Sequence, residues 1–394
     1  MKYALLIGDG MADFPVGSLD NRTPLEYAAT PNMDACAHEG VVGGVKTVPD
    51  GMPPGSDVAN MSVMGYDPAR YYNGRAPIEA ASMGVPLAAG DIAFRCNLVT
   101  LDATRMVDYS AGHIETGEAC KIIRELKDAL DSRTVTFYPG VSYRHLAVMH
   151  GFPGGKLSCT PPHDISGKEY KPGLPTGAGQ ELVRTLFYRA RDILAHSTAN
   201  AKRKESGKSP VTDIWLWGQG PAIALPTLQE RYSLSGSVVS AVDLIKGLGV
   251  LAGLTVRTVP GATGYLDTNY AGKVEAAEAA LTEQDLVYLH VEAPDETSHE
   301  GSLEKKIQAI EDFDKNIVGE MRKLMRHFDT MKICVLPDHA TPVSMKTHHA
   351  MPVPWAACGA GITSGSARTY CEKSAKNSEV ISGVELFDRF VRKD

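Results

Sequence analysis

Cysteine is scarce in this chain and follows no pairing pattern. The 394 residues include 7 cysteines, and none of them forms a C-x-x-C motif. An odd number of scattered cysteines argues against a disulfide framework. We therefore expect no disulfide framework and a reducing, cytoplasmic compartment.

Long apolar runs are absent as well. The first run, Tyr3–Ile7, stops at Gly8 and is too short for the core of a signal peptide. No run reaches the roughly 18 apolar residues that a transmembrane helix needs. Lys and Arg number 40 against 47 Asp and Glu, a net charge of −7. This balance predicts no nucleic acid and no membrane as a partner.

Three common active-site motifs are also missing. Gly8-Asp9-Gly10 follows an apolar run, but Asp13 stands where a dinucleotide-binding loop needs glycine. The segment 151–156 is one residue too short for a P-loop, and Leu157 replaces its Ser or Thr. No G-x-S-x-G motif surrounds Ser56. Nicotinamide, P-loop ATP and α/β-hydrolase functions therefore lose their main support.

Short apolar runs alternate with helical patterns in much of the chain, which predicts a doubly wound α/β domain. Helices are predicted over Ala271–Leu281 and Leu303–His327, the second from apolar residues spaced three and four apart. The runs predicted as buried parallel strands are Tyr3–Ile7, Ile214–Trp217, Val238–Val242, Leu254–Val259, Leu286–Val291 and Ile333–Leu336.

The middle of the chain predicts a smaller α+β domain, inserted between strands of the larger one. Its polar, basic end, Ser197–Pro210, is predicted to be the return linker. The predicted boundaries are 1–84 and 211–394 for the large domain and 85–210 for the insertion. The elements predicted within it are strands Ala93–Leu101, Val135–Tyr138 and His145–Met149 and helices Glu115–Leu130 and Gln180–Leu194.

Carboxylate and imidazole side chains follow two of the predicted strands. Asp9 comes after the first run, and Asp338-His339 comes after Ile333–Leu336. His348-His349 stands nine residues further on. Ligand sites of open α/β sheets gather at the carboxyl ends of strands, and this mixture of ligands suits manganese or zinc. A turn-forming Asp9 and a chance cluster of histidines are the alternatives.

A third predicted strand, Leu286–Val291, is followed by Asp295 and His299. Pro294 favours the start of a helical turn, and residues four apart on a helix share one face. Asp295 and His299 can therefore bind the same metal. The alternative is an N-cap aspartate beside an unrelated surface histidine.

Ser56 stands between Gly55 and Asp57, before an apolar segment. One interpretation is a helix N-cap. The other is a nucleophile, because a bound divalent cation lowers the pKa of a hydroxyl and a helix N-terminus favours a phosphate.

Together these segments resemble the alkaline phosphatase superfamily, and more closely the cofactor-independent phosphoglycerate mutases of the archaeal type. The similarity spans nearly the whole chain. The matching stretches are LLIGDGMAD, PPGSDVANMSVMGYDP, GRAPIEAASMG, AFRCNLVT, VSYRHLAV, SAVDLIKGLG, VEAPDETSHEG, LPDHATP and HHAMPVPW.

The resemblance implies an alkaline-phosphatase-like core, an inserted domain that closes over the substrate, and two divalent metal ions. Manganese is the first choice, with Zn²⁺, Co²⁺ or Mg²⁺ as alternatives, and no 2,3-bisphosphoglycerate is required. One metal would be held by Asp9, Ser56, Asp338 and His339, and the other by Asp295, His299 and His348. His348 is preferred to His349 because it lies four residues before the first proline of the P-V-P segment.

The implied reaction is the interconversion of 3-phosphoglycerate and 2-phosphoglycerate through a phosphoserine. Ser56 and Lys246 would be catalytic. The substrate would be bound by Arg75, Arg95, Arg144, His163 and Asp164. A surface role for Lys246 and structural ion pairs for the arginines are the alternatives. For the whole chain, the alternatives are another phosphotransferase or phosphatase of the superfamily, such as a homoserine kinase, and a non-catalytic metal-binding protein.

Overall fold

The computed structural model describes residues 1–153, 155–376 and 378–392, and the chain forms two compact units. Unit 1 comprises Met1–Tyr72 and Ala224–Asp394, and unit 2 comprises Asn73–Ile223. Unit 1 is an α/β core, and unit 2 is an α+β insertion within its sequence. The predicted fold class is therefore confirmed.

Unit 1 is built on an eight-stranded sheet with the order β11-β10-β12-β1-β13-β14-β2-β15. Strands β11, β10, β12, β1 and β13 run parallel to one another, whereas β14 runs antiparallel to both β13 and β2. The strands are β1 (Lys2–Gly8), β2 (Val41–Lys46), β10 (Gly236–Val239), β11 (Thr255–Val256), β12 (Leu286–Val291), β13 (Met331–Leu336), β14 (Val353–Gly359) and β15 (Val380–Ser382).

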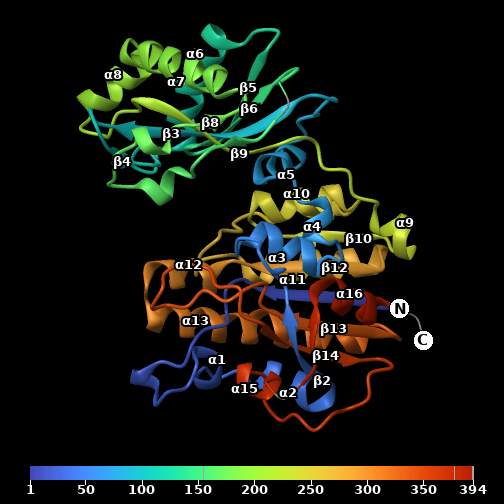
Figure 1. The fold of residues 1–394 in the computed structure, drawn as a ribbon. Helices are drawn as coiled ribbons and strands as arrows, with labels where there is room; N and C mark the ends of the chain where they lie inside the picture. Colours follow the sequence, from blue (N-terminus) through green and yellow to red (C-terminus); the bar gives the residue numbers. More distant parts are fainter. Residues whose placement is uncertain (154, 377, 393–394) are drawn as a thin grey trace. The chain divides into compact units, whose positions relative to one another are not determined.

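Helices cover both faces of this sheet (Figure 1). Along β1, Ala4 and Leu6 join the core formed with α2, α11 and α13, while the Tyr3 ring packs against Phe390 of α16. The longer helices are α2 (Pro31–Glu39), α3 (Ser56–Val63), α10 (Asp243–Leu251), α11 (Tyr270–Glu283), α12 (Ala293–Glu300), α13 (Leu303–Phe313) and α16 (Gly383–Val391). The shorter helices are α1 (Pro24–Tyr27), α4 (Pro68–Tyr71), α9 (Leu228–Tyr232), α14 (Gly319–Leu324) and α15 (Glu372–Ala375).

Both helices predicted for the core are present. The first is α11, and the second is α13 continued through a π-helical turn, Asp314–Val318, into α14. The apolar residues Ile310, Phe313 and Ile317 are buried, as their spacing predicted.

Unit 2 has an antiparallel sheet of order β4-β3-β6-β5. Strand β9 also pairs with β3, along the edge opposite β6. Helices α6 and α7 pack on this sheet. Its strands are β3 (Ile92–Leu101), β4 (Met106–Asp108), β5 (Val135–Val141), β6 (Arg144–Met149), β7 (Leu157–Ser158), β8 (Thr176–Gly177) and β9 (Asp213–Gly220). Its helices are α5 (Arg75–Ser82), α6 (Thr116–Leu130), α7 (Gln180–Ala195) and α8 (Thr198–Glu205).

Two predictions about this part of the chain were wrong. The run Ile214–Trp217 is not a parallel strand of the core, because β9 pairs antiparallel with β3 of the insertion. The predicted linker contains helix α8, because Ser197 caps it by accepting a hydrogen bond from the Asn200 amide and Arg203 is buried against Glu118. Residues 73–84 and 211–223, which lie outside the predicted insertion, belong to unit 2, because α5 and β9 contact β3.

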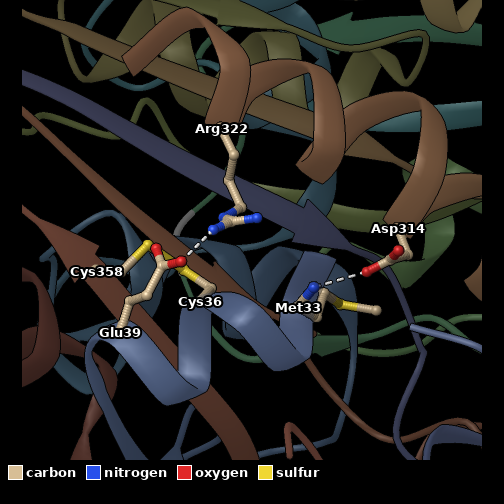
Figure 2. The surroundings of a disulfide bond; sticks show 6 residues. All are labelled: Met33, Cys36, Glu39, Asp314, Arg322 and Cys358. Atoms are coloured by element: carbon tan, nitrogen blue, oxygen red, sulfur yellow. Dashed lines mark hydrogen bonds and ion pairs between the residues drawn. A yellow bond between two sulfur atoms is a disulfide. The ribbon is translucent and has the colours of Figure 1, made fainter. Parts of the chain in front are cut away.

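A disulfide joins Cys36 of α2 to Cys358 of β14 (Figure 2). The scattered cysteines predicted no disulfide framework and a reducing compartment, and this single disulfide corrects that expectation at one position. The two residues are separated by 322 positions in sequence, and packing of α2 on β14 brings their Cα atoms within 5.4 Å. The other cysteines, Cys96, Cys120, Cys159, Cys334 and Cys371, are free.

Among the described residues, no helix is long and apolar enough to cross a membrane.

Candidate metal centre and active site

Three strand ends of unit 1 bring the predicted acidic residues together. Strand β1 lies between β12 and β13, and all three are parallel. Asp9, Asp295 and Asp338 follow these strands and are almost completely buried. The doubly wound sheet therefore gathers the carboxylates at one edge, as expected for a ligand site.

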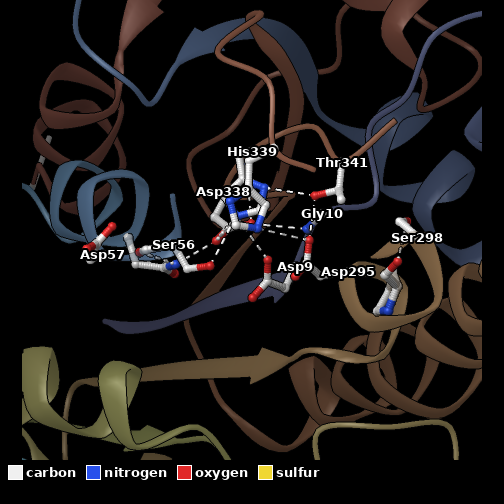
Figure 3. A network of polar contacts seen from close by, with 12 residues as sticks. Asp9, Gly10, Ser56, Asp57, Asp295, Ser298, Asp338, His339 and Thr341 are labelled. Atoms are coloured by element: carbon white, nitrogen blue, oxygen red, sulfur yellow. Dashed lines mark hydrogen bonds and ion pairs between the residues drawn. The ribbon is translucent and has the colours of Figure 1, made fainter. Parts of the chain in front are cut away.

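Asp9, Asp338 and His339 form a first group whose ligand atoms lie within 4.8 Å of one another. The Nε2 atom of His339 is 3.4 Å from Asp9 Oδ1 and 3.5 Å from Asp338 Oδ2. Asp338 also accepts a hydrogen bond from the Gly10 amide, at 3.1 Å. Figure 3 shows these side chains converging.

Ser56 adjoins this first group. It is the first residue of α3, and its Oγ lies 3.1 Å from Nε2 of His339. The N-cap of α3 is Gly55, and no side chain caps the helix. The hydroxyl of Ser56 therefore contacts the metal-ligand candidates, and the N-cap interpretation does not describe it.

Asp295, His299 and His348 form a second group, also with ligand atoms within 4.8 Å. In α12, His299 Nε2 is 3.1 Å from Asp295 Oδ2, as the spacing of four residues predicted. The Nε2 atom of His348 is 3.0 Å from that of His299 and 3.6 Å from Asp295 Oδ1. His349 instead packs its ring against Phe14 and accepts a hydrogen bond from the Met351 amide.

The two groups are adjacent, because the rings of His339 and His348 have centroids only 4.2 Å apart. This closeness perturbs the acids. Burial raises the pKa of Asp9 well above its usual range, and the charges of Asp338 and Asp295 raise it further. Two nearby carboxylates cannot both ionise easily without a counter-charge. A divalent cation would supply that charge.

The second group has the opposite balance. Burial would raise the pKa of Asp295, but hydrogen bonds with His299 and His348 outweigh it and hold that pKa well below its usual range. Burial would lower the pKa of His299, yet its hydrogen bond with Asp295 raises the pKa to about 9. This raised pKa favours the protonated imidazole at neutral pH, so a cation bound at this group would compete with a proton.

The donor set fits divalent cations. Asp9 Oδ1 is buried and accepts no hydrogen bond from any residue that the structure describes. Nδ1 of His299 donates to the Lys346 carbonyl, at 3.0 Å, which directs Nε2 toward its group. Carboxylate oxygens and imidazole nitrogens in this combination suit zinc and manganese.

Sequence reasoning missed the residues that hold these ligands. His290 donates from Nε2 to Asp9 Oδ2 at 2.9 Å, and burial lowers its pKa to about 3. Asn60 donates to Asp338 Oδ2 at 2.6 Å. The sequence offered two signals for them: His290 is a polar residue inside the apolar run Leu286–Val291, and Asn60 lies one helical turn after Ser56.

Lys246 lies in α10 and forms an ion pair with Asp243 at 3.2 Å. A second lysine, Lys273, was not singled out. It is buried and donates to the carbonyl of His290 at 3.0 Å, and burial lowers its pKa to about 8. The positive charge of Lys246 lowers the pKa of Lys273 further.

The three predicted arginines gather around one glutamate in unit 2. Arg75 and Arg95 form ion pairs with Glu79 at 3.1 Å and 2.9 Å. Burial would raise the pKa of Glu79, but the charges of Arg95, Arg75 and Arg144 outweigh it and lower that pKa. Two guanidinium groups therefore share one carboxylate, and the charge of a third, that of Arg144, also acts on it.

His163 and Asp164 lie in a 3₁₀ turn of unit 2 and are 3.7 Å apart, with about half of each side chain exposed. The His163 ring contacts Trp217, and the guanidinium of Arg95 stacks over the same indole at 4.3 Å from its ring. The indole therefore links this pair to the arginine cluster.

The chain is similar to known proteins over most of its length. Residues 37–200 match the family model described as 2,3-bisphosphoglycerate-independent phosphoglycerate mutase. A protein of that name from Methanosarcina acetivorans is 56% identical over 357 residues, 90% of this chain and 90% of that protein.

Two solved structures share the fold. A cofactor-independent phosphoglycerate mutase from Thermoplasma acidophilum is 28% identical, with a TM-score of 0.66 and 99% of both chains covered. A protein from Pyrococcus horikoshii is 27% identical, with a TM-score of 0.83, covering 100% of this chain and 98% of that one.

Proposed function

Because the chain belongs to the family of 2,3-bisphosphoglycerate-independent phosphoglycerate mutases, we propose that it interconverts 3-phosphoglycerate and 2-phosphoglycerate in glycolysis and gluconeogenesis. The observation that carries the proposal is the meeting of two carboxylate–imidazole groups beside the hydroxyl of Ser56. The proposed compartment is the cytoplasm, because the enzymes of these pathways work there.

In this proposal each group holds one divalent cation. Asp9, Asp338, His339 and Ser56 form one site. Asp295, His299 and His348 form the other. Manganese fits the mixed oxygen and nitrogen ligands, and Zn²⁺, Co²⁺ and Mg²⁺ are the alternatives. When bound, the cations would lower the pKa of the serine hydroxyl and offset the charge of the phosphoryl group.

Ser56 is the proposed nucleophile. Its Oγ attacks the phosphorus of phosphoglycerate, the bond from phosphorus to the substrate oxygen breaks, the serine proton passes to that oxygen, and a phosphoserine forms. Glycerate is retained and its other hydroxyl attacks the phosphoserine, which regenerates Ser56. The start of α3, which presents backbone N–H groups near Ser56, favours the negative charge of the phosphoryl group. Lys246 supplies a further positive charge for the phosphate.

Unit 2 supplies the proposed substrate-binding residues. Arg75, Arg95 and Arg144 would bind the carboxylate and phosphate, because a guanidinium pairs with planar anions through two parallel hydrogen bonds. His163 and Asp164 would contact the glycerate hydroxyls. The insertion is proposed to close over the substrate and exclude water.

The decisive assay uses the purified full-length chain stripped of metal. With Mn²⁺ and 3-phosphoglycerate but no 2,3-bisphosphoglycerate, the protein should form 2-phosphoglycerate, which added enolase converts to phosphoenolpyruvate. Chelation should abolish the formation of 2-phosphoglycerate, read directly by ³¹P NMR because enolase itself needs a divalent metal, and Mn²⁺ should restore it. Full activity without metal would refute the metal-dependent mechanism. Phosphate release in place of isomerisation would identify a phosphatase, and metal binding without turnover would identify a non-catalytic protein.

A further inference from the structure

One hydroxyl outside both ligand groups contacts a member of each. Thr341 Oγ1 donates a hydrogen bond to Asp295 Oδ1 and lies 3.1 Å from Nδ1 of His339. Figure 3 shows Thr341 with both partners. Asp295 belongs to one group and His339 to the other. Thr341 is not a member of either group, yet its hydroxyl joins them.

Proton counting sets the direction of these bonds. A threonine hydroxyl has one proton, and the carboxylate of Asp295 can only accept. Thr341 therefore gives its proton to Asp295 and accepts the proton of His339 Nδ1. The tautomer of His339 is thereby decided, and Nε2 presents its lone pair toward Asp9 and Asp338.

The backbone of Thr341 is held as firmly as its side chain. The residue is fully buried, and its amide donates to the Ala12 carbonyl at 3.1 Å. The buried ammonium of Lys306 donates to the carbonyls of Thr341 and Ala12, at 2.9 Å and 3.2 Å, and to Asp13 at 2.8 Å. The hydroxyl therefore has little freedom to move away from either ligand.

The chain leaves room for this bridge at Gly10. A Cβ atom there would lie 2.5 Å from Asp295 Oδ1 and 2.6 Å from Thr341 Oγ1, and the φ of +64° also favours glycine. Any side chain at this position would displace the bond between Thr341 and Asp295. Glycine at this position therefore allows the backbone after Asp9 to pass close to the hydrogen bond between Thr341 and Asp295.

We propose that Thr341 is a positioning residue that prepares both metal sites at once. It selects the metal-binding tautomer of His339 in one site and orients the carboxylate of Asp295 in the other. This inference rests on the proposed function, because it requires that the two groups bind divalent cations. It adds that the two sites share one structural determinant, so that removing a single hydroxyl weakens both.

The test compares Thr341→Val and Thr341→Ala, which remove the hydroxyl, with Thr341→Ser, which keeps it. Thr297→Val is the matched control. Thr297 is equally buried and lies in α12 near Asp295, but its hydroxyl donates to the Ala293 carbonyl. Mn²⁺ binding to each metal-stripped protein is measured by calorimetry, metal content by mass spectrometry, and the fold by circular dichroism.

Loss of the hydroxyl should weaken Mn²⁺ binding at both sites by about 10- to 100-fold, the usual effect of removing a partner of a metal ligand. Thr341→Ser should restore the affinity, and Thr297→Val should leave it unchanged. Unchanged affinity in folded Thr341→Val or Thr341→Ala protein would overturn the inference, and so would weakening at only one site. If the wild-type chain itself binds no Mn²⁺, the proposed metal sites fail, and the inference fails with them.

Discussion

The hydroxyl of Ser56 lies 3.1 Å from Nε2 of His339, whereas the helix that begins at Ser56 is capped by Gly55. A serine at a helix start is often a cap, and its replacement then costs stability. Here the hydroxyl faces the ligand groups and makes no such cap bond. Its proposed chemical role can therefore be separated from any role in folding.

Replacing Ser56 with Ala should abolish catalysis and leave the fold intact. Loss of a nucleophile costs about a thousandfold or more in turnover, while the unfolding free energy should change by only about 0.5 kcal/mol because no cap is lost. The coupled enolase assay and chemical denaturation measure the two effects. Ser62→Ala, which changes a buried serine of the same helix, is the control. Turnover within tenfold of wild type would remove Ser56 from the chemistry.

Replacing His299 with Ala should reduce the number of bound metal ions from two to one per chain. The change removes one of the three proposed ligands of the second group and none of the first group. Metal content after equilibration with Mn²⁺ and desalting provides the measurement. His327→Ala, at an exposed histidine, is the control. Two tightly held ions in His299→Ala protein would show that this residue is not a ligand.

Metal binding at the second group should tighten as the pH rises toward about 9. The pKa of His299 is raised to about 9 by its hydrogen bond with Asp295, so a cation must displace a proton at neutral pH. In metal-free protein, the stability from this pair is fully present below the ordinary histidine pKa of about 6.5 and is lost as the pH rises through about 9. Calorimetry in buffers of different ionisation enthalpy should detect a released proton at pH 7.5. Binding without proton release, and with the same affinity from pH 7 to 9, would contradict the expectation.

The wild-type enzyme should keep glycerate bound through its cycle. Labelled free glycerate added during turnover should not enter the phosphoglycerates, and phosphate release should be at least about tenfold slower than isomerisation, because a mutase must exclude water from its phosphoserine. Arg144→Ala should raise the ratio of phosphate release to isomerisation, since it removes one charge of the arginine cluster. Arg124→Ala, at an exposed arginine of α6, should not. Rapid phosphate release by the wild type would mean that the chain is a phosphatase.

The disulfide should be detectable by counting thiols. Unfolded without reductant, the chain should show five reactive thiols of its seven cysteines, because Cys36 and Cys358 are paired. Cys36→Ser should lower the unfolding free energy by about 2–4 kcal/mol, mainly by releasing a constraint on the unfolded chain. Cys120→Ser, at a free cysteine of unit 2, is the control. Seven reactive thiols in protein purified without reductant would contradict the pairing.

Local patterns in the sequence determined the α/β class, the helices α11 and α13, and the positions of Asp9, Asp295 and Asp338 at strand ends. These features depend on periodicity within a few residues and on the rule that ligands gather where parallel strands end. The pairing of Asp295 with His299 was also a local prediction, because residues four apart on a helix lie on the same face.

Only the tertiary structure decided which distant segments meet. Strand β9 pairs with β3, and Cys36 reaches Cys358, although more than 100 residues separate the first pair and 322 the second, and no local pattern encodes these contacts. The same holds for Thr341, whose hydroxyl is an ordinary polar group in sequence and a bridge between two ligand groups in the fold. A hydrogen bond depends on where both of its partners lie, and for Thr341 and Asp295, which follow different strands, that is settled only when the sheet has formed.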